Sequence, residues 1–137
     1  MVYEELSIQG VPAENIAGIW PQVAPLLVPC LHAAEYDEQS LLESLEAKDV
    51  QLWVGRRGGH VICAMTTRID AHHCGKVATI LHVGGEFDEG FRDYLPRLKQ
   101  WAKESGAGHL RVIGRAGWQR WLKEHFETHY TMLEAKL

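Results

Sequence analysis

Apolar residues recur along this chain with two different spacings, which separate its expected strands from its expected helices. Alternation at every second position is typical of half-buried strands, whereas spacings of three and four are typical of amphipathic helices. The expected strands cover residues 2–9, 51–55, 60–69, 76–83, 109–114 and 127–137. The expected helices cover residues 16–34, 37–47, 88–105 and 118–125. No repeat or linker interrupts this alternation, so we expect one α/β domain over residues 1–137.

The helix expected at 88–105 has the clearest apolar face. The apolar residues at helical spacing are Phe91, Leu95, Leu98, Trp101 and Ala102. We expect Leu95, Leu98 and Trp101 to be buried against the sheet. Because Pro96 has no N–H, the helix must either kink there or begin near Asp93. A separate apolar face on the helix at 37–47 consists of Leu41, Leu42 and Leu45.

Glycine and proline punctuate the rest of the pattern. The turn at residues 56–59 holds two glycines between two strands, which predicts a β-hairpin. Asn15 is placed to cap the helix at 16–34. That helix has no charged residue, but its three prolines remove hydrogen bonds that lipid could not replace. We therefore expect a bent, packed helix there and no membrane span.

Composition and charge narrow the function classes. The chain has 137 residues, of which 46% are hydrophobic and 23% charged, as in an ordinary globular domain. Its net charge of −4 and pI near 6.0 give no electrostatic footprint for nucleic acid. Three cysteines and no signal-peptide pattern favour a reducing, cytoplasmic environment over a disulfide-stapled secreted one.

Neither a metal site nor a catalytic nucleophile stands out. His72, His73 and Cys74 are adjacent, whereas zinc ligands usually come in pairs with two or more residues between them, so we expect a polar turn and no metal. There is no G-x-S-x-G motif, and Cys63 alternates with apolar residues on an expected core strand. Trp118 and Trp121 lie three residues apart on one expected helix. They are either core residues or a platform for a ligand.

The segment at residues 80–90 reads as strand, glycine pair and helix. That order often forms an anion cradle, because backbone N–H groups at a helix start favour negative charge. Here the glycines are followed by Glu86, Asp88 and Glu89, with no Lys or Arg. The segment is therefore either a nucleotide-cofactor site or the remains of one.

The order of these elements resembles the GNAT N-acetyltransferase fold. Residues 121–126 read W-L-K-E-H-F and are similar to the closing helix of that family, which often reads F-Y-x-K-x-G-F. More narrowly, the Gly84–Gly85 pair and residues 114–122, G-R-A-G-W-Q-R-W-L, are similar to small GNAT-like proteins of bacteriophages and prophages. The resemblance covers residues 15–137. It implies a mixed, mostly antiparallel sheet with splayed central parallel strands and flanking helices.

The resemblance also implies a place for a cofactor. In the family, acyl-CoA lies between the splayed strands, and its pantetheine arm pairs with the fourth strand. The corresponding cofactor-binding residues here are Ile80, Leu81, His82, Val83, Gly84, Gly85 and, if CoA binds, Trp118. The loop at 84–90 would wrap the pyrophosphate. The candidates for a catalytic base are Glu86 and His82, acting directly or through water.

Two departures from the family pattern bear on activity. The family's pyrophosphate loop begins with a basic or amide residue, whereas this loop is acidic. The family's closing helix often supplies a tyrosine as general acid, and Trp121 stands at that position. We therefore expect a phage-type protein that binds no cofactor and acts as a non-catalytic interaction or virion module, with phage or host proteins as partners. We expect it in the host cytoplasm or in a phage particle. The alternative is an acetyl-CoA-dependent N-acetyltransferase acting on a small amine or a protein amino group.

Overall fold

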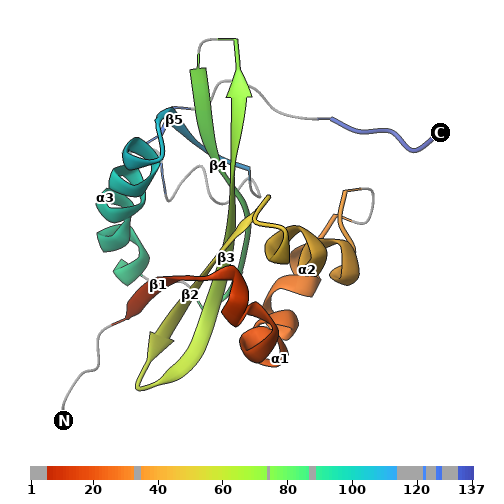
Figure 1. Ribbon diagram of the computed structural model, residues 1–137, viewed down its shortest axis with the longest axis vertical. Helices are drawn as coiled ribbons and strands as arrows, with labels where there is room; N and C mark the ends of the chain where they lie inside the picture. The colour runs from red at the N-terminus through yellow and green to blue at the C-terminus, as the bar shows by residue number, and fades with distance from the viewer. Residues whose placement is uncertain are drawn as a thin grey trace.

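The computed structural model describes residues 6–32, 35–73, 75–86, 89–113, 122, 126–127 and 133–137, with only the backbone of residues 89–93. Within these residues a single sheet has the strand order β1-β2-β3-β4-β5 (Figure 1). The strands are β1 (Ser7–Val11), β2 (Gln51–Arg57), β3 (His60–His72), β4 (Gly75–Gly85) and β5 (Ala107–Val112). The first three strand pairs are antiparallel, and β4 and β5 are parallel. The expected mixed, mostly antiparallel sheet is confirmed.

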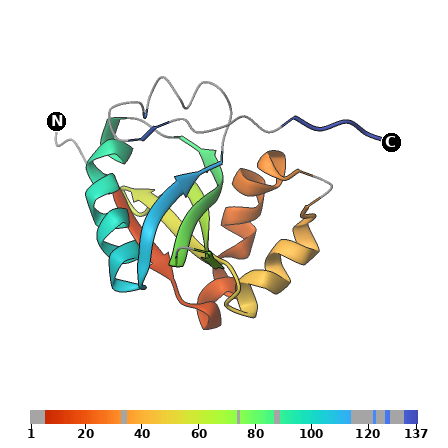
Figure 2. The ribbon, with the colours of Figure 1, turned by 90° about the horizontal axis from the view of Figure 1, so that it is seen from above.

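Helices cover both faces of this sheet. They are α1 (Ile16–Leu27), α2 (Glu38–Glu46) and α3 (Glu89–Glu104), with short 3-10 turns η1 (Ala13–Asn15) and η2 (Val28–Cys30). Figure 2 shows α1 and α2 on one face and α3 on the other. We call these the α1/α2 face and the α3 face. No helix in the described part of the chain combines the length and the apolar content needed to cross a bilayer.

Each face has its own hydrophobic core, as the two amphipathic patterns predict. On the α3 face, Leu95 and Leu98 are buried among residues of β2, β3 and β4, and Trp101 is half-buried. The Trp101 ring meets the ring of Trp53 edge-to-face at 5.1 Å between centroids. On the other face, α2 buries its leucine face against α1 and the sheet. The expected burial of both leucine sets is confirmed, with Leu42 half-buried.

The β2–β3 hairpin is also confirmed. Its turn consists of Gly58 and Gly59, whose φ angles of 61° and 78° lie in the left-handed region that favours glycine. The helix at 37–47 begins where expected, because Asp37 and Ser40 form a capping box. In it, the Asp37 carboxylate accepts a bond from the Ser40 N–H, which lowers the pKa of Asp37.

Several helix boundaries differ from the prediction. The helix α3 begins at Glu89 and continues through Pro96, which is exposed on its solvent side. The helix α1 ends at Leu27 and is followed by the 3-10 turn η2, whereas the expected helix continued to residue 34. Pro21 and Pro25 both lie within α1, so a missing proline N–H does not by itself end this helix. The side chain of Asn15 makes no capping bond, because its backbone is already in the η1 turn.

Two strand predictions also need correction. The strand β1, expected at residues 2–9, occupies Ser7–Val11 at the sheet edge, and residues 1–5 lie outside the described part. The closing strand expected at 127–137 is wrong at residue 127 and at residues 133–137, which pair with no strand. Glu134 instead lies 2.8 Å from His32 Nε2, near the end of α1. The expected helix at 118–125 lies outside the described residues except Leu122, which is helical and buried on the α3 face.

Leu98 provides a test of the α3 face. It is 1% exposed, so Leu98→Ala leaves a cavity and should lower the free energy of unfolding by about 2–5 kcal/mol. Urea denaturation followed by tryptophan fluorescence measures the change. The control is Leu133→Ala at a position that is 89% exposed, where a change within about 0.5 kcal/mol is expected. Equal effects of the two substitutions would contradict this packing.

Candidate functional site

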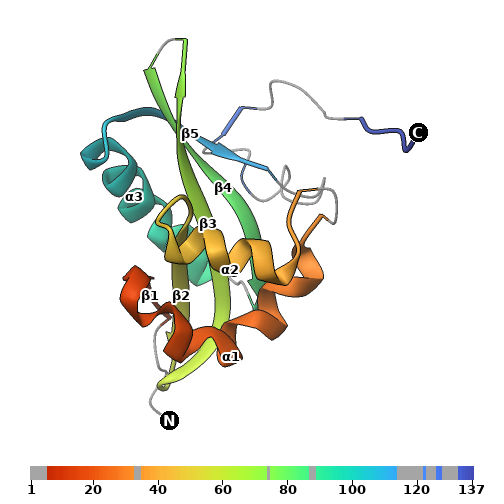
Figure 3. The same ribbon diagram turned by 45° about the vertical axis from the view of Figure 1, so that its right-hand side comes forward.

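The pairing of the two parallel strands covers only the first half of β4. Their pairing runs from Lys76 opposite Ala107 to Ile80 opposite Val112, and the Ile113 N–H bonds the Ile80 carbonyl at 3.0 Å. Beyond Ile80, β4 continues to Gly85 paired only with β3 among the described residues. Figure 3 shows β5 beside β4, and β4 continuing past the end of β5. Since β5 ends at Val112, opposite Ile80, the expected splay of two central parallel strands lies beyond the described part of β5.

A β-bulge lies at the point of separation. In the β3–β4 pairing, Thr67 is opposite Ile80 and Thr66 is opposite His82, so Leu81 is the extra residue. A bulge bends its strand and increases the local twist. It also places two successive side chains on one face: Leu81 packs in the core of the α1/α2 face, and His82 reaches Thr66 on the same face. Ile80 remains on the α3 face.

His82 is buried at this bulge, with 7% of its surface exposed. Its Nδ1 lies 2.6 Å from the Thr66 hydroxyl, and its ring meets the Tyr36 ring edge-to-face at 5.3 Å. Burial lowers the pKa of His82, and the nearby guanidinium of Arg68 lowers it further. The carboxylate of Glu35 acts in the opposite direction. This shift favours the neutral imidazole, which can act as a hydrogen-bond acceptor or a base.

Tyr36 connects His82 to a charged pair at the surface. Its hydroxyl accepts a 3.3 Å bond from an Arg68 terminal nitrogen, and Arg68 Nε donates to Asp70 at 2.8 Å. The Asp70 hydrogen bond raises the pKa of Arg68. The capping box of α2 fixes the backbone immediately after Tyr36. Bulge, cap and ion pair together determine where the His82 ring lies.

Sequence reasoning named His82 but missed Glu35, Tyr36 and Arg68. The alternation of β3 places Thr66 and Arg68 on one face, which is a signal that the sequence contains. Nothing in the sequence indicates that Tyr36, 46 positions before His82, would meet its ring. That contact depends on how α2 packs on the sheet.

The glycine pair does not form the expected turn, because both glycines are the last residues of β4. A Cβ on Gly84 would lie 2.0 Å from the carbonyl oxygen of Leu26 at the end of α1. Gly85 has a φ of 96°, and a Cβ there would lie 2.3 Å from the carbonyl oxygen of Ile62. Both positions therefore need glycine for close backbone packing.

The backbone around this pair is bonded into the fold. The Glu86 N–H donates to the Ile62 carbonyl at 2.9 Å, and the Val83 carbonyl accepts from the Cys30 thiol at 3.3 Å. The Glu86 side chain is exposed at the end of β4. Phe87, Asp88 and Trp118 lie outside the described residues. Among the described residues there is no group of three or more metal-ligating side chains, and Cys74 is not one of these residues.

His82 yields a pH-dependent prediction. The pKa of His82 is lower in the folded chain than its ordinary value of ~6.5. Below about that pH, the unfolded chain therefore binds more protons than the folded chain. The stability that His82 contributes is therefore complete above that pH and is lost as the pH falls. Between pH 7.5 and 5.5, the wild type should lose more free energy of unfolding than His82→Gln, measured by urea denaturation. His60→Gln, in the exposed hairpin, should keep the wild-type pH dependence; identical curves for all three proteins would refute the assignment.

Comparisons with known proteins identify the fold. Neither protein-family models nor curated proteins give a match. Among solved structures, an aminoglycoside acetyltransferase, meta-AAC0020, from an uncultured soil metagenomic sample superposes with a TM-score of 0.70 at 14% identity, over 96% of each chain. A ribosomal-protein-alanine N-acetyltransferase from Brucella melitensis biovar Abortus 2308 gives 0.65 at 11% identity, over 96% of this chain and 99% of that one.

A third structure contains the cofactor that the resemblance implies. It is the aminoglycoside N-acetyltransferase AAC(6')-Iy in complex with CoA, with a TM-score of 0.61 and 14% identity, over 97% of this chain and 95% of that one. At such identities the similarity establishes the arrangement of strands and helices. This chain has the mixed α/β fold of the GNAT acetyltransferases.

Proposed function

We propose that this chain is a GNAT-fold protein with a degraded acyl-CoA site, acting as a non-catalytic interaction module. The observation that carries the proposal is the inward bonding at the end of β4. The Glu86 N–H, which a pyrophosphate cradle would turn towards the cofactor, donates to Ile62 instead. The two glycines before it belong to β4, where an added Cβ would meet the backbone of Leu26 or of Ile62.

Charge supports the same proposal. Glu86, Asp88 and Glu89 follow the glycine pair with no basic residue between them. A pyrophosphate placed there would meet like charges, which salt screens only beyond a Debye length of about 8 Å. Backbone donors at the start of α3 would have to overcome that repulsion.

The source of the partners follows from the sequence resemblance. The G-R-A-G-W-Q-R-W-L run at residues 114–122 is similar to small GNAT-like proteins of bacteriophages and prophages. We therefore expect phage or host proteins as partners, and a place in the host cytoplasm or in the phage particle. Affinity capture from phage-infected and uninfected cells, followed by mass spectrometry, tests this part.

A second candidate is an acyl-CoA-dependent N-acyltransferase. It is favoured by the separation of β4 from β5, with His82 at the bulge. Acyl-CoA would supply the thioester, and either the neutral His82 or Glu86 would accept the proton that an attacking amine loses. Two of the superposed structures are named as an aminoglycoside acetyltransferase and a ribosomal-protein-alanine N-acetyltransferase. The acceptor would accordingly be a small amine or a protein amino group. The close contacts of His82 with Thr66 and Tyr36 equally suit a packed strand residue.

Calorimetric titration with acetyl-CoA at low salt separates the two candidates. The non-catalytic module should give no heat of binding up to millimolar acetyl-CoA, because the loop is acidic and the Glu86 N–H is bonded to Ile62. A dissociation constant in the micromolar range would contradict the proposal and favour the enzyme.

Charge-neutral variants show whether the acidic residues are the cause. If repulsion prevents binding, Glu86→Gln combined with Asp88→Asn should create measurable acetyl-CoA binding that weakens as salt rises. Glu104→Gln at the far end of α3 is the matched control and should leave binding unchanged. If neither variant binds acetyl-CoA, the hydrogen bond between the Glu86 N–H and Ile62 is enough to prevent binding without the charges.

A further inference from the structure

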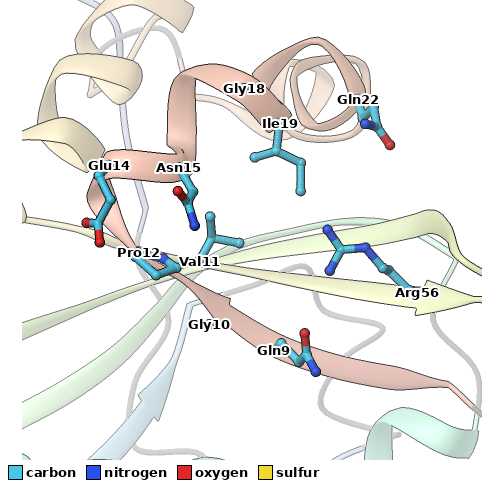
Figure 4. A pocket seen from close by; sticks show the side chains of 10 residues that line it. All are labelled: Gln9, Gly10, Val11, Pro12, Glu14, Asn15, Gly18, Ile19, Gln22 and Arg56. Carbon is cyan, nitrogen blue, oxygen red and sulfur yellow. The ribbon is translucent and has the colours of Figure 1, made fainter.

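A polar groove lies between α1 and the outer strands of the sheet, at the edge opposite β5 (Figure 4). We call it the β1–α1 groove. Its volume is about 540 Å³, within the range of ligand-binding clefts. Its walls come from β1 with the turn that follows it, from α1, and from Arg56 of β2. Gly18 of α1 leaves space there, since a Cβ on it would meet nothing within 4 Å.

Five polar side chains line this groove without partners. They are Gln9, Glu14, Asn15, Gln22 and Arg56. Among the described residues, none of the five makes a side-chain hydrogen bond or an ion pair. Figure 4 shows the Arg56 guanidinium in the space between the strands and α1. Three amides, one carboxylate and one guanidinium thus remain available to a ligand.

The two charges lie at opposite ends of the groove. Arg56 is opposite Ser7 in the strand register, whereas Val11, which is opposite Leu52, lies at the end from which the chain leads to Glu14. Ser7 and Val11 are four residues apart on β1, or about 14 Å at 3.4 Å per residue. An extended segment of about four residues therefore has the length to reach both ends.

The groove also borders a strand with an open edge. Among the described residues, β1 pairs only with β2, so its alternate N–H and C=O groups point away from the sheet. An open strand edge and amide side chains are suited to bonding another backbone. A peptide uses all of these groups, whereas a simple anion would use Arg56 alone.

We propose that the β1–α1 groove binds an extended peptide segment of about four residues, acidic at one end and basic at the other. Arg56 pairs with the acidic side chain and Glu14 with the basic one. The amides of Gln9, Asn15 and Gln22 bond the peptide backbone between them. The inference rests on the proposed interaction module and gives that module a binding surface distinct from the β4–β5 opening.

The test uses three capped tetrapeptides: Lys-Ala-Ala-Glu, Lys-Ala-Ala-Lys and Glu-Ala-Ala-Glu. Each is titrated into the ¹⁵N-labelled full chain and followed by two-dimensional NMR. The mixed-charge peptide should shift the amide signals of Gly10, Gly18 and Gln22, and should bind at least threefold more tightly than either like-charged peptide. Equal binding of all three, or shifts confined to other surfaces, would overturn the proposal.

Charge reversal at Arg56 gives a sharper test. Arg56→Glu makes both ends acidic, so the preference should change to Lys-Ala-Ala-Lys by threefold or more. Arg111→Glu on β5, at the opposite edge, is the matched control and should keep the wild-type preference. If Arg56→Glu lowers the melting temperature, Arg56→Gln replaces it and should lose the preference for the mixed peptide over Lys-Ala-Ala-Lys.

An unchanged preference in a folded Arg56 variant would overturn the proposal. These titrations contain no acetyl-CoA, so their outcome is independent of the calorimetric result. Acetyl-CoA binding together with peptide binding would refute only the degraded site, whereas loss of peptide binding alone would refute only the groove.

Discussion

The bulge at Leu81 is the constraint on which the arrangement of the candidate site depends. Up to Ile80, β4 holds two partners at once, antiparallel β3 and parallel β5. The extra residue bends β4, and beyond it only the β3 pairing continues. The same residue places the His82 ring on the α1/α2 face, beside Tyr36. One irregularity in a hydrogen-bond ladder thus lies where the β5 pairing ends and sets the face of the sheet on which His82 is buried.

Local periodicity was sufficient for much of the fold. Leu95 and Leu98 repeat at helical spacing, and two glycines separate two alternating runs, so their burial and the hairpin follow from neighbours in the sequence. The errors arose where distant segments decide the outcome. Gly84 and Gly85 were read as a loop because paired glycines usually form turns. Both positions need glycine because the backbones of α1 and β3 come close to them. No local sequence pattern shows such an approach between distant segments.

The candidate site was predictable only in part for the same reason. The resemblance points to the carboxyl end of β4 and to His82, and among the described residues that end of β4 pairs with β3 alone. The environment of His82 comes from the segment before α2 and from β3, and its lowered pKa results from that packing. The sequence determines function even less, because one fold serves acetyltransferases with unrelated acceptors.

The helix α1 links both proposals. It lines the groove with Gln22, and the carbonyl of its Leu26 lies close to Gly84.

The contact between Gly84 and Leu26 has a consequence for natural variation. Every amino-acid replacement of a glycine adds at least a Cβ, and here that atom would collide with a main-chain oxygen that cannot rotate away. Each missense change at this codon must therefore displace α1 or be eliminated by selection. Relatives that keep the glycine would do so whether or not they bind a nucleotide. Conservation of this glycine would then reflect the position of α1. It would not distinguish catalytically active relatives from inactive ones.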